Sequence, residues 1–143
     1  MYKRVLFATD FDEVGISGAR KAKKIAEENN AELLLVHVVE PIPAYAYPGF
    51  AGFAEVEESI REQAEKELAT LAEELGVDKA HRLIEFGSVK NEVLRIAHEK
   101  NIDLIVTGSH GKHGLALLLG STAHAILHGA ECDVLIVRSE VKA

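Results

Sequence analysis

The residues of this chain best suited to chemistry lie between positions 104 and 122, where glycines and hydroxyls follow a short apolar run. Gly108, Gly111 and Gly114 come after the run, and Gly120-Ser121-Thr122 precedes a segment with a helical pattern. Glycine lets a ligand approach the backbone closely because it has no Cβ, and it also tolerates positive φ. A helix start with Ser and Thr offers free N–H groups, hydroxyls and the positive end of the helix dipole, which suit a phosphate.

His110 and Lys112 add hydrogen-bond donors to the same loop, so the stretch favours an anionic, phosphate-bearing ligand. The alternative is structural, because glycines after a strand often only form a turn and a Ser-Thr pair often only caps a helix. Neither the GxxxxGK[ST] pattern nor a GxGxxG pattern after the first strand occurs. The spacing alone leaves both interpretations open.

Strand-length apolar runs alternate with longer amphipathic segments along the chain. The predicted strands are 5–8, 33–39, 81–86, 104–106 and 134–137, and the predicted helices are 14–29, 54–75, 89–100 and 121–127. Residues 33–36 are apolar without alternation, as expected for a parallel strand covered on both faces. Such alternation of strands and helices predicts βαβ units and a single α/β domain, residues 1–143, with one open, mostly parallel sheet and helices on both faces.

Polar residues fall where the predicted strands end. Thr9 and Asp10 follow the first strand, His37 and Val38 lie in the second, and Gly108 follows the fourth. Ligands of open parallel sheets bind beyond the carboxyl ends of the strands, where the strand order reverses. We therefore expect these residues to converge on one site. Residues 41–52 form a long irregular segment, interpreted as a cover over the site or as a partner surface.

Composition limits the class of protein. The chain has 143 residues and a formal net charge of −7, which fits one domain and argues against a nucleic-acid or anionic-membrane surface. No signal-peptide pattern opens the chain, and the apolar runs are shorter than the roughly 20 residues of a membrane helix. The single cysteine excludes an internal disulfide and suits a reducing compartment. We predict that the protein is cytoplasmic and binds neither nucleic acid nor a membrane.

Two other patterns could mark a metal site. Asp10 and Asp12 resemble the Mg²⁺-holding acidic pair of a response-regulator receiver, but the third predicted strand contains Glu85 instead of ending in a phosphorylatable Asp. His124 and His128 are four residues apart on one helical face and form a possible metal pair, although a packed or solvated pair is the simpler interpretation. We therefore predict no metal site made of protein ligands.

Catalytic patterns are also missing. There is no GxSxG sequence around a serine nucleophile. His37 lies inside an apolar run, which favours a hydrogen-bonded core histidine over a catalytic base. Cys132 precedes the last strand and is predicted to be a small buried hydrophobe.

The last predicted strand, Val134 to Val137, should lie at the edge of the sheet, and pairing with its copy across a two-fold axis would cover it. We predict a homodimer and no catalytic residues.

Several of these segments, set side by side, resemble the universal stress protein (UspA) family. They are Ala8-Thr9-Asp10, His37-Val38, the stretch from Gly108 to Thr122 and the ending Cys132 to Arg138. The resemblance covers essentially the whole chain. It implies a Rossmann-like (HUP) α/β fold with five strands in the order 3-2-1-4-5, usually a homodimer, and a role in the stress response. Many members bind ATP or AMP through the pattern G-x2-G-x9-G-[ST].

The resemblance also implies a role for each matching residue. Asp10 would meet the ribose or adenine, Ala8 and Thr9 would line that pocket, and Val38 would offer backbone contacts to the adenine edge. The remaining residues would surround the ribose and phosphates: Gly108 and His110 beside the ribose and first phosphate, and Gly111, Gly120, Ser121 and Thr122 around the phosphates. Mg²⁺, where it takes part, would bridge phosphates of ATP.

One interval departs from the family pattern. Eight residues, 112–119, separate Gly111 from Gly120, where the pattern has nine. The shorter interval leaves open whether ATP or AMP is the better ligand. Two alternatives to a nucleotide-binding regulator are a slow ATPase or self-phosphorylating enzyme that uses Ser121, and a dimeric interaction module without a nucleotide.

Overall fold

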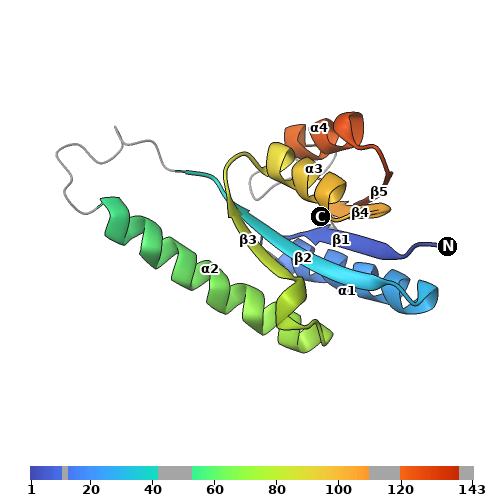
Figure 1. Cartoon of the computed structure of the whole chain (residues 1–143), viewed down its shortest axis with the longest axis horizontal. Coiled ribbons are helices and arrows are strands. Elements are labelled where there is room, and N and C mark those ends of the chain that lie inside the picture. Colours follow the sequence, from blue (N-terminus) through green and yellow to red (C-terminus); the bar gives the residue numbers. More distant parts are fainter. Residues whose placement is uncertain (11–12, 42–52, 110–119, 139–143) are drawn as a thin grey trace, which may run out of the picture.

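The computed structural model describes residues 1–10, 13–41, 53–109 and 120–138. In chain order the described elements are β1 (Arg4–Ala8), α1 (Glu13–Asn29), β2 (Glu32–Val39), α2 (Phe53–Leu75), the 3-10 helix η2 (Lys79–His81), β3 (Arg82–Phe86), α3 (Val89–Glu99), β4 (Leu104–Gly108), α4 (Ser121–Gly129) and β5 (Asp133–Val137). The strands form one five-stranded, all-parallel sheet in the order β3-β2-β1-β4-β5 (Figure 1). The predicted fold class is confirmed.

Each predicted element differs from the structure by one or two residues at one end, and two of these differences have identifiable reasons. His81 belongs to η2 rather than to β3, which begins at Arg82. β4 continues past the apolar run to Gly108, because Thr107 and Gly108 stay paired with Ile136 and Val137 of β5. The irregular segment predicted at 41–52 lies, apart from its first residue, outside the described residues.

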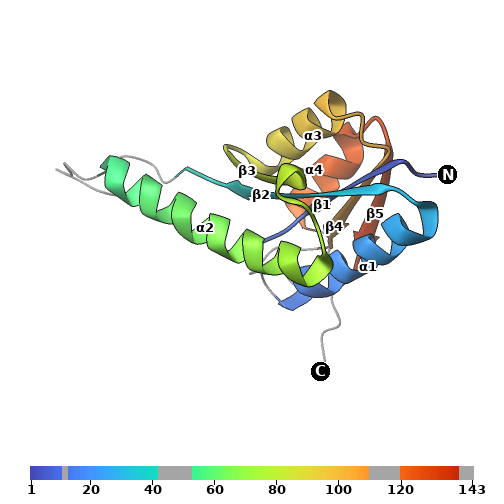
Figure 2. The same ribbon diagram turned by 60° about the horizontal axis from the view of Figure 1, so that its bottom comes forward.

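The helices cover both faces of the sheet, with α1 and α2 on one face and α3 and α4 on the other (Figures 1 and 2). Successive residues of a strand point to opposite faces, so each strand contributes to two cores. The α1/α2-side core contains Val5, Phe7, Leu33, Leu35 and Val106. The α3/α4-side core contains Leu6, Leu34, Val36, Ile105 and Ile126. The consecutive apolar residues of β2 thus fill both layers, as predicted for a buried parallel strand.

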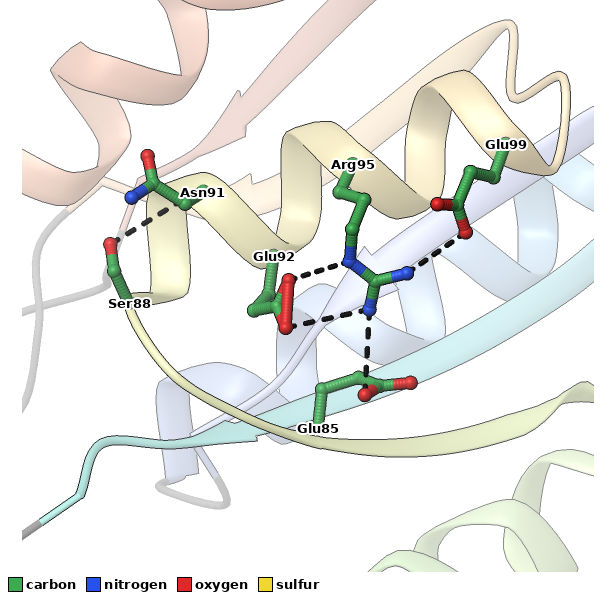
Figure 3. Close-up of polar contacts among 6 residues, drawn as sticks. All are labelled: Glu85, Ser88, Asn91, Glu92, Arg95 and Glu99. Atoms are coloured by element: carbon green, nitrogen blue, oxygen red, sulfur yellow. Dashed lines mark hydrogen bonds and ion pairs between the residues drawn. The ribbon is translucent and has the colours of Figure 1, made fainter.

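An ionic cluster attaches α3 to the edge strand β3 (Figure 3). The Arg95 guanidinium binds Glu92 at 2.7 Å and Glu99 at 2.8 Å on its own helix, and lies 3.4 Å from the Glu85 carboxylate on β3. The hydrogen bond to Glu92 is the main reason that the pKa of Arg95 is raised. The cluster is exposed to solvent, so it contributes little to the stability of the protein. Its role is to position α3 against β3.

Among the described helices, none combines the length and the apolar character needed to cross a membrane.

Candidate functional site

The central strand β1 and its neighbour β4 separate at their carboxyl ends. β1 and β4 pair only from Val5 and Leu104 to Phe7 and Val106. Beyond that point the Thr9 amide donates to the Val36 carbonyl at 2.9 Å, on the β2 side. The boundary between β1 and β4 is also where the strand order reverses. Open α/β sheets bind their ligands at this position, so the fold itself marks it as the candidate site.

After β4 the chain turns away from β1, toward β5. The Ser109 amide donates to the Val137 carbonyl at 2.9 Å, and the Ser109 carbonyl accepts the Gly120 amide at 2.6 Å. This second hydrogen bond fixes the start of α4 directly beside the end of β4. Ser109 and its neighbour Thr107 are buried polar residues that sequence reasoning did not select. The sequence feature that could have indicated them is their position on either side of Gly108.

The N-cap residue of α4 makes no side-chain hydrogen bond to the first turn of the helix. Gly120 is its N-cap residue and has no side chain that could accept the amides of the first turn. By contrast, the Ser88 hydroxyl at the start of α3 accepts the Asn91 amide at 3.5 Å (Figure 3). The side chains of Ser121 and Thr122 are exposed. The start of α4 therefore offers main-chain donors, two hydroxyls and the positive end of a helix dipole.

The conformation of Gly120 shows which of the two properties of glycine matters at this position. Its φ of −64° and ψ of 153° lie in the extended region that any residue adopts. Conformational freedom is thus not the reason for glycine at this position. The remaining physical reason is the missing side chain, which leaves the first turn of α4 open to an acceptor from elsewhere.

The predicted adenosine-side residues lie at the same end of the sheet. Ala8 and Val38 pack into the α3/α4-side core, the face that α4 covers. Thr9 is buried and Asp10 is exposed immediately after β1. The structure therefore brings these four residues and the start of α4 to one end of the sheet.

The other predicted phosphate-side residues divide into two groups. Gly108 ends β4, and Gly120, Ser121 and Thr122 start α4. His110 and Gly111 lie outside the described residues, as does the interval 112–119 that departs from the family pattern.

The competing metal and receiver patterns have structural explanations. The rings of His124 and His128 pack edge to face with centroids 4.8 Å apart. No group of three or more His, Cys, Asp or Glu residues that could hold a metal exists within the described ranges. Glu85 pairs with Arg95 at 3.4 Å and so helps to attach α3 to β3. Asp12 of the receiver-like acidic pair lies outside the described residues.

Cys132 lies away from the candidate site. It precedes β5, so it is at the amino end of the sheet, and it is half-buried rather than buried as predicted. Burial raises the pKa of its thiol, which lowers the fraction of reactive thiolate. Together with His98 and Glu131 it lines a cavity of about 460 Å³ between α3 and the α4–β5 connection. This cavity is therefore separate from the carboxyl end of the sheet.

Comparisons with known proteins agree with this fold. Residues 1–138 match the Universal stress protein family. The chain is 40% identical over 139 residues to Universal stress protein A homolog 2 of Coxiella burnetii, covering 96% of this chain and 95% of the relative. It is 35% identical over 146 residues to Universal stress protein MJ0531 of Methanocaldococcus jannaschii, covering 99% and 85%.

Two solved structures extend the comparison. The structure of the hypothetical protein MJ0577 superposes with a TM-score of 0.84 and 26% identity, covering 99% of both chains. A universal stress protein in complex with cAMP superposes with a TM-score of 0.64 and 26% identity, covering 96% of this chain and 97% of that one. The family match spans nearly the whole chain and the fold agrees with it, so this protein belongs to the universal stress protein family.

Proposed function

We propose that this protein binds an adenine nucleotide, ATP or AMP, at the carboxyl end of its sheet and acts as a dimeric regulator of the stress response. The observation that carries the proposal is the start of α4. Its N-cap is a glycine, and the Gly120–Ser109 hydrogen bond of 2.6 Å holds it at the reversal point of the strand order. A phosphate would supply the acceptor that the missing cap does not. A structural relative solved in complex with cAMP, itself an adenine nucleotide, supports the same ligand class.

In this proposal the site has two halves. The adenosine half consists of Ala8, Thr9, Asp10 and Val38, where the exposed Asp10 carboxylate can accept a ribose hydroxyl. The phosphate half consists of the motif residues Gly108, His110, Gly111, Gly120, Ser121 and Thr122. With ATP, Mg²⁺ would bridge the phosphates, which is the usual mode for this ion.

Titration calorimetry tests the ligand class. We expect saturable binding of ATP and AMP with one nucleotide per chain, and weaker binding of GTP. A large preference for ATP would indicate that the eight-residue interval still accommodates the outer phosphates, and equal affinities would indicate that only the first phosphate is held. Heats of dilution alone for both adenine nucleotides at millimolar concentration would refute the proposal.

We also propose that β5 forms a homodimer interface. Among the described strands β5 pairs with β4 alone, and its Leu135 side chain is 37% exposed. An exposed apolar edge strand can pair with another chain, and a second copy of β5 across a two-fold axis would cover it. We expect sedimentation equilibrium to give twice the chain mass of 15.6 kDa at micromolar concentration.

The variant Leu135→Lys should shift that equilibrium to the monomer, because a buried lysine at the interface loses its hydration. Leu127→Lys is the matched control, since Leu127 is 49% exposed but lies on α4. A monomeric wild-type protein, or equal dissociation by both variants, would contradict this interface.

A further inference from the structure

The side chain of His37 makes a hydrogen bond between two strands at the candidate site. Its Nδ1 atom lies 2.7 Å from the carbonyl oxygen of Thr9, the residue that follows β1. A carbonyl oxygen can only accept, so Nδ1 carries the proton. His37 has the same strand parity as Leu33 and Leu35, which places it on the α1/α2 face of β2, opposite Val38.

This hydrogen bond takes the place of the next step in the β1–β2 ladder. The Thr9 amide donates to the Val36 carbonyl at 2.9 Å, so the regular continuation would be from the Val38 amide to the Thr9 carbonyl. Both residues are described, and no hydrogen bond joins that amide to that carbonyl. The imidazole of His37 uses the carbonyl instead.

The direction of the Val38 main chain follows from its neighbours. The Val36 carbonyl bonds toward β1, and the Val39 carbonyl bonds toward β3 by accepting the Gly87 amide at 3.0 Å. Main-chain groups alternate between the two sides along a strand. The Val38 N–H and C=O therefore point to the β1 side, just beyond the last β1–β2 ladder bond and at the candidate site.

We propose that His37 is a positioning residue for the base subsite, holding the Thr9 carbonyl so that the Val38 N–H and C=O remain available to the edge of adenine. This inference rests on the proposed function, and it deepens it by naming a residue that positions the groups that would recognise the base. Adenine presents an acceptor, N1, beside a donor, the N6 amino group, which match one N–H and one C=O. Guanine presents the donor and the acceptor in exchanged positions and cannot make both bonds in the same orientation.

Two substitutions separate a positioning role from a structural one. His37→Phe keeps a flat ring and removes the donor, whereas His37→Asn keeps an N–H donor close to the position of Nδ1. We expect His37→Phe to weaken ATP binding about tenfold, the cost of one or two hydrogen bonds, and to leave GTP binding unchanged. His37→Asn should retain most of the ATP affinity. His81→Phe is the matched control, since His81 lies at the opposite end of the sheet, 3.5 Å from Glu32.

Hydrogen exchange of the Val38 amide provides a readout without a nucleotide. In His37→Phe the released Thr9 carbonyl can accept this amide, so its exchange should slow relative to the wild-type protein. Equal loss of ATP and GTP affinity in His37→Phe, or an unchanged ATP affinity and ATP-to-GTP ratio, would overturn the role of His37 while the proposed function stands. A wild-type protein that binds no nucleotide would overturn both.

Discussion

Replacing Gly120 with Asp is expected to abolish nucleotide binding without destabilising the protein. The φ and ψ of Gly120, −64° and 153°, suit any residue, and Asp is among the best N-cap residues. Its carboxylate would accept the amides of the first turn of α4 and place a negative charge where we propose a phosphate. We expect ATP affinity to fall by about 100-fold or more, since charge-assisted hydrogen bonds are replaced by like-charge repulsion. The free energy of unfolding should stay constant or rise by a few tenths of a kcal/mol.

The matched control for this prediction is Gly120→Asn. Asparagine has nearly the same shape as aspartate and also caps helices, but it has no charge. Titration calorimetry should therefore place its ATP affinity between those of the wild type and Gly120→Asp, and urea unfolding should confirm that both variants are folded. Wild-type ATP affinity in Gly120→Asp would exclude the start of α4 as the phosphate site.

The substitution Phe7→Ala should cause the largest loss of stability. Phe7 is 1% exposed in the central strand β1, and its ring packs against the backbone of α1 at Gly18. A Cβ added at Gly18 would lie only 3.0 Å from the Phe7 ring, so the ring fills the space between strand and helix completely. We expect the free energy of unfolding to fall by about 3–5 kcal/mol, a large share of the total stability of a domain.

Urea unfolding measures this loss, and Phe7→Leu is its control. Leucine keeps most of the buried apolar volume, so it should cost clearly less than alanine. A loss below about 1 kcal/mol for Phe7→Ala would mean that the layers of the sheet and α1 close over the cavity more readily than native packing suggests.

The sequence predicted the fold well because its strongest signal was the spacing of apolar residues. The unbroken run from Leu33 to Val36 indicated a strand covered on both faces, and both cores contain it. The errors occurred where pairing or local turns outweighed composition. Thr107 and Gly108 are a polar residue and a glycine, yet they extend β4 because β5 lies beside them. His81 looked like the start of a strand but completes the turn of η2.

The candidate site was predictable only in outline. Strand ends and the family resemblance located Asp10, Val38 and the start of α4, since parallel strands end on the same side of a sheet. The hydrogen bond between Gly120 and Ser109, and that between His37 and Thr9, were not predictable. Both depend on how a loop or a side chain turns in three dimensions, and apolar periodicity contains no information on rotamers. The sequence therefore indicated which of the described residues lie at one end of the sheet, but not which donors and acceptors would face a ligand there.

The position of the first strand affects how the chain acquires its structure during translation. β1 lies at the centre of the sheet between β2 and β4, and the Asp103 carboxylate accepts the amides of Lys3 and Arg4 at 2.8 Å and 3.1 Å. A ribosome makes β1 about a hundred residues before its β4 neighbour. Until then a nascent chain has one side of β1 unpaired, and an unpaired apolar strand of this kind is prone to aggregation. β1 is thus synthesised well before β4, yet it is paired on both sides only after β4 has been made.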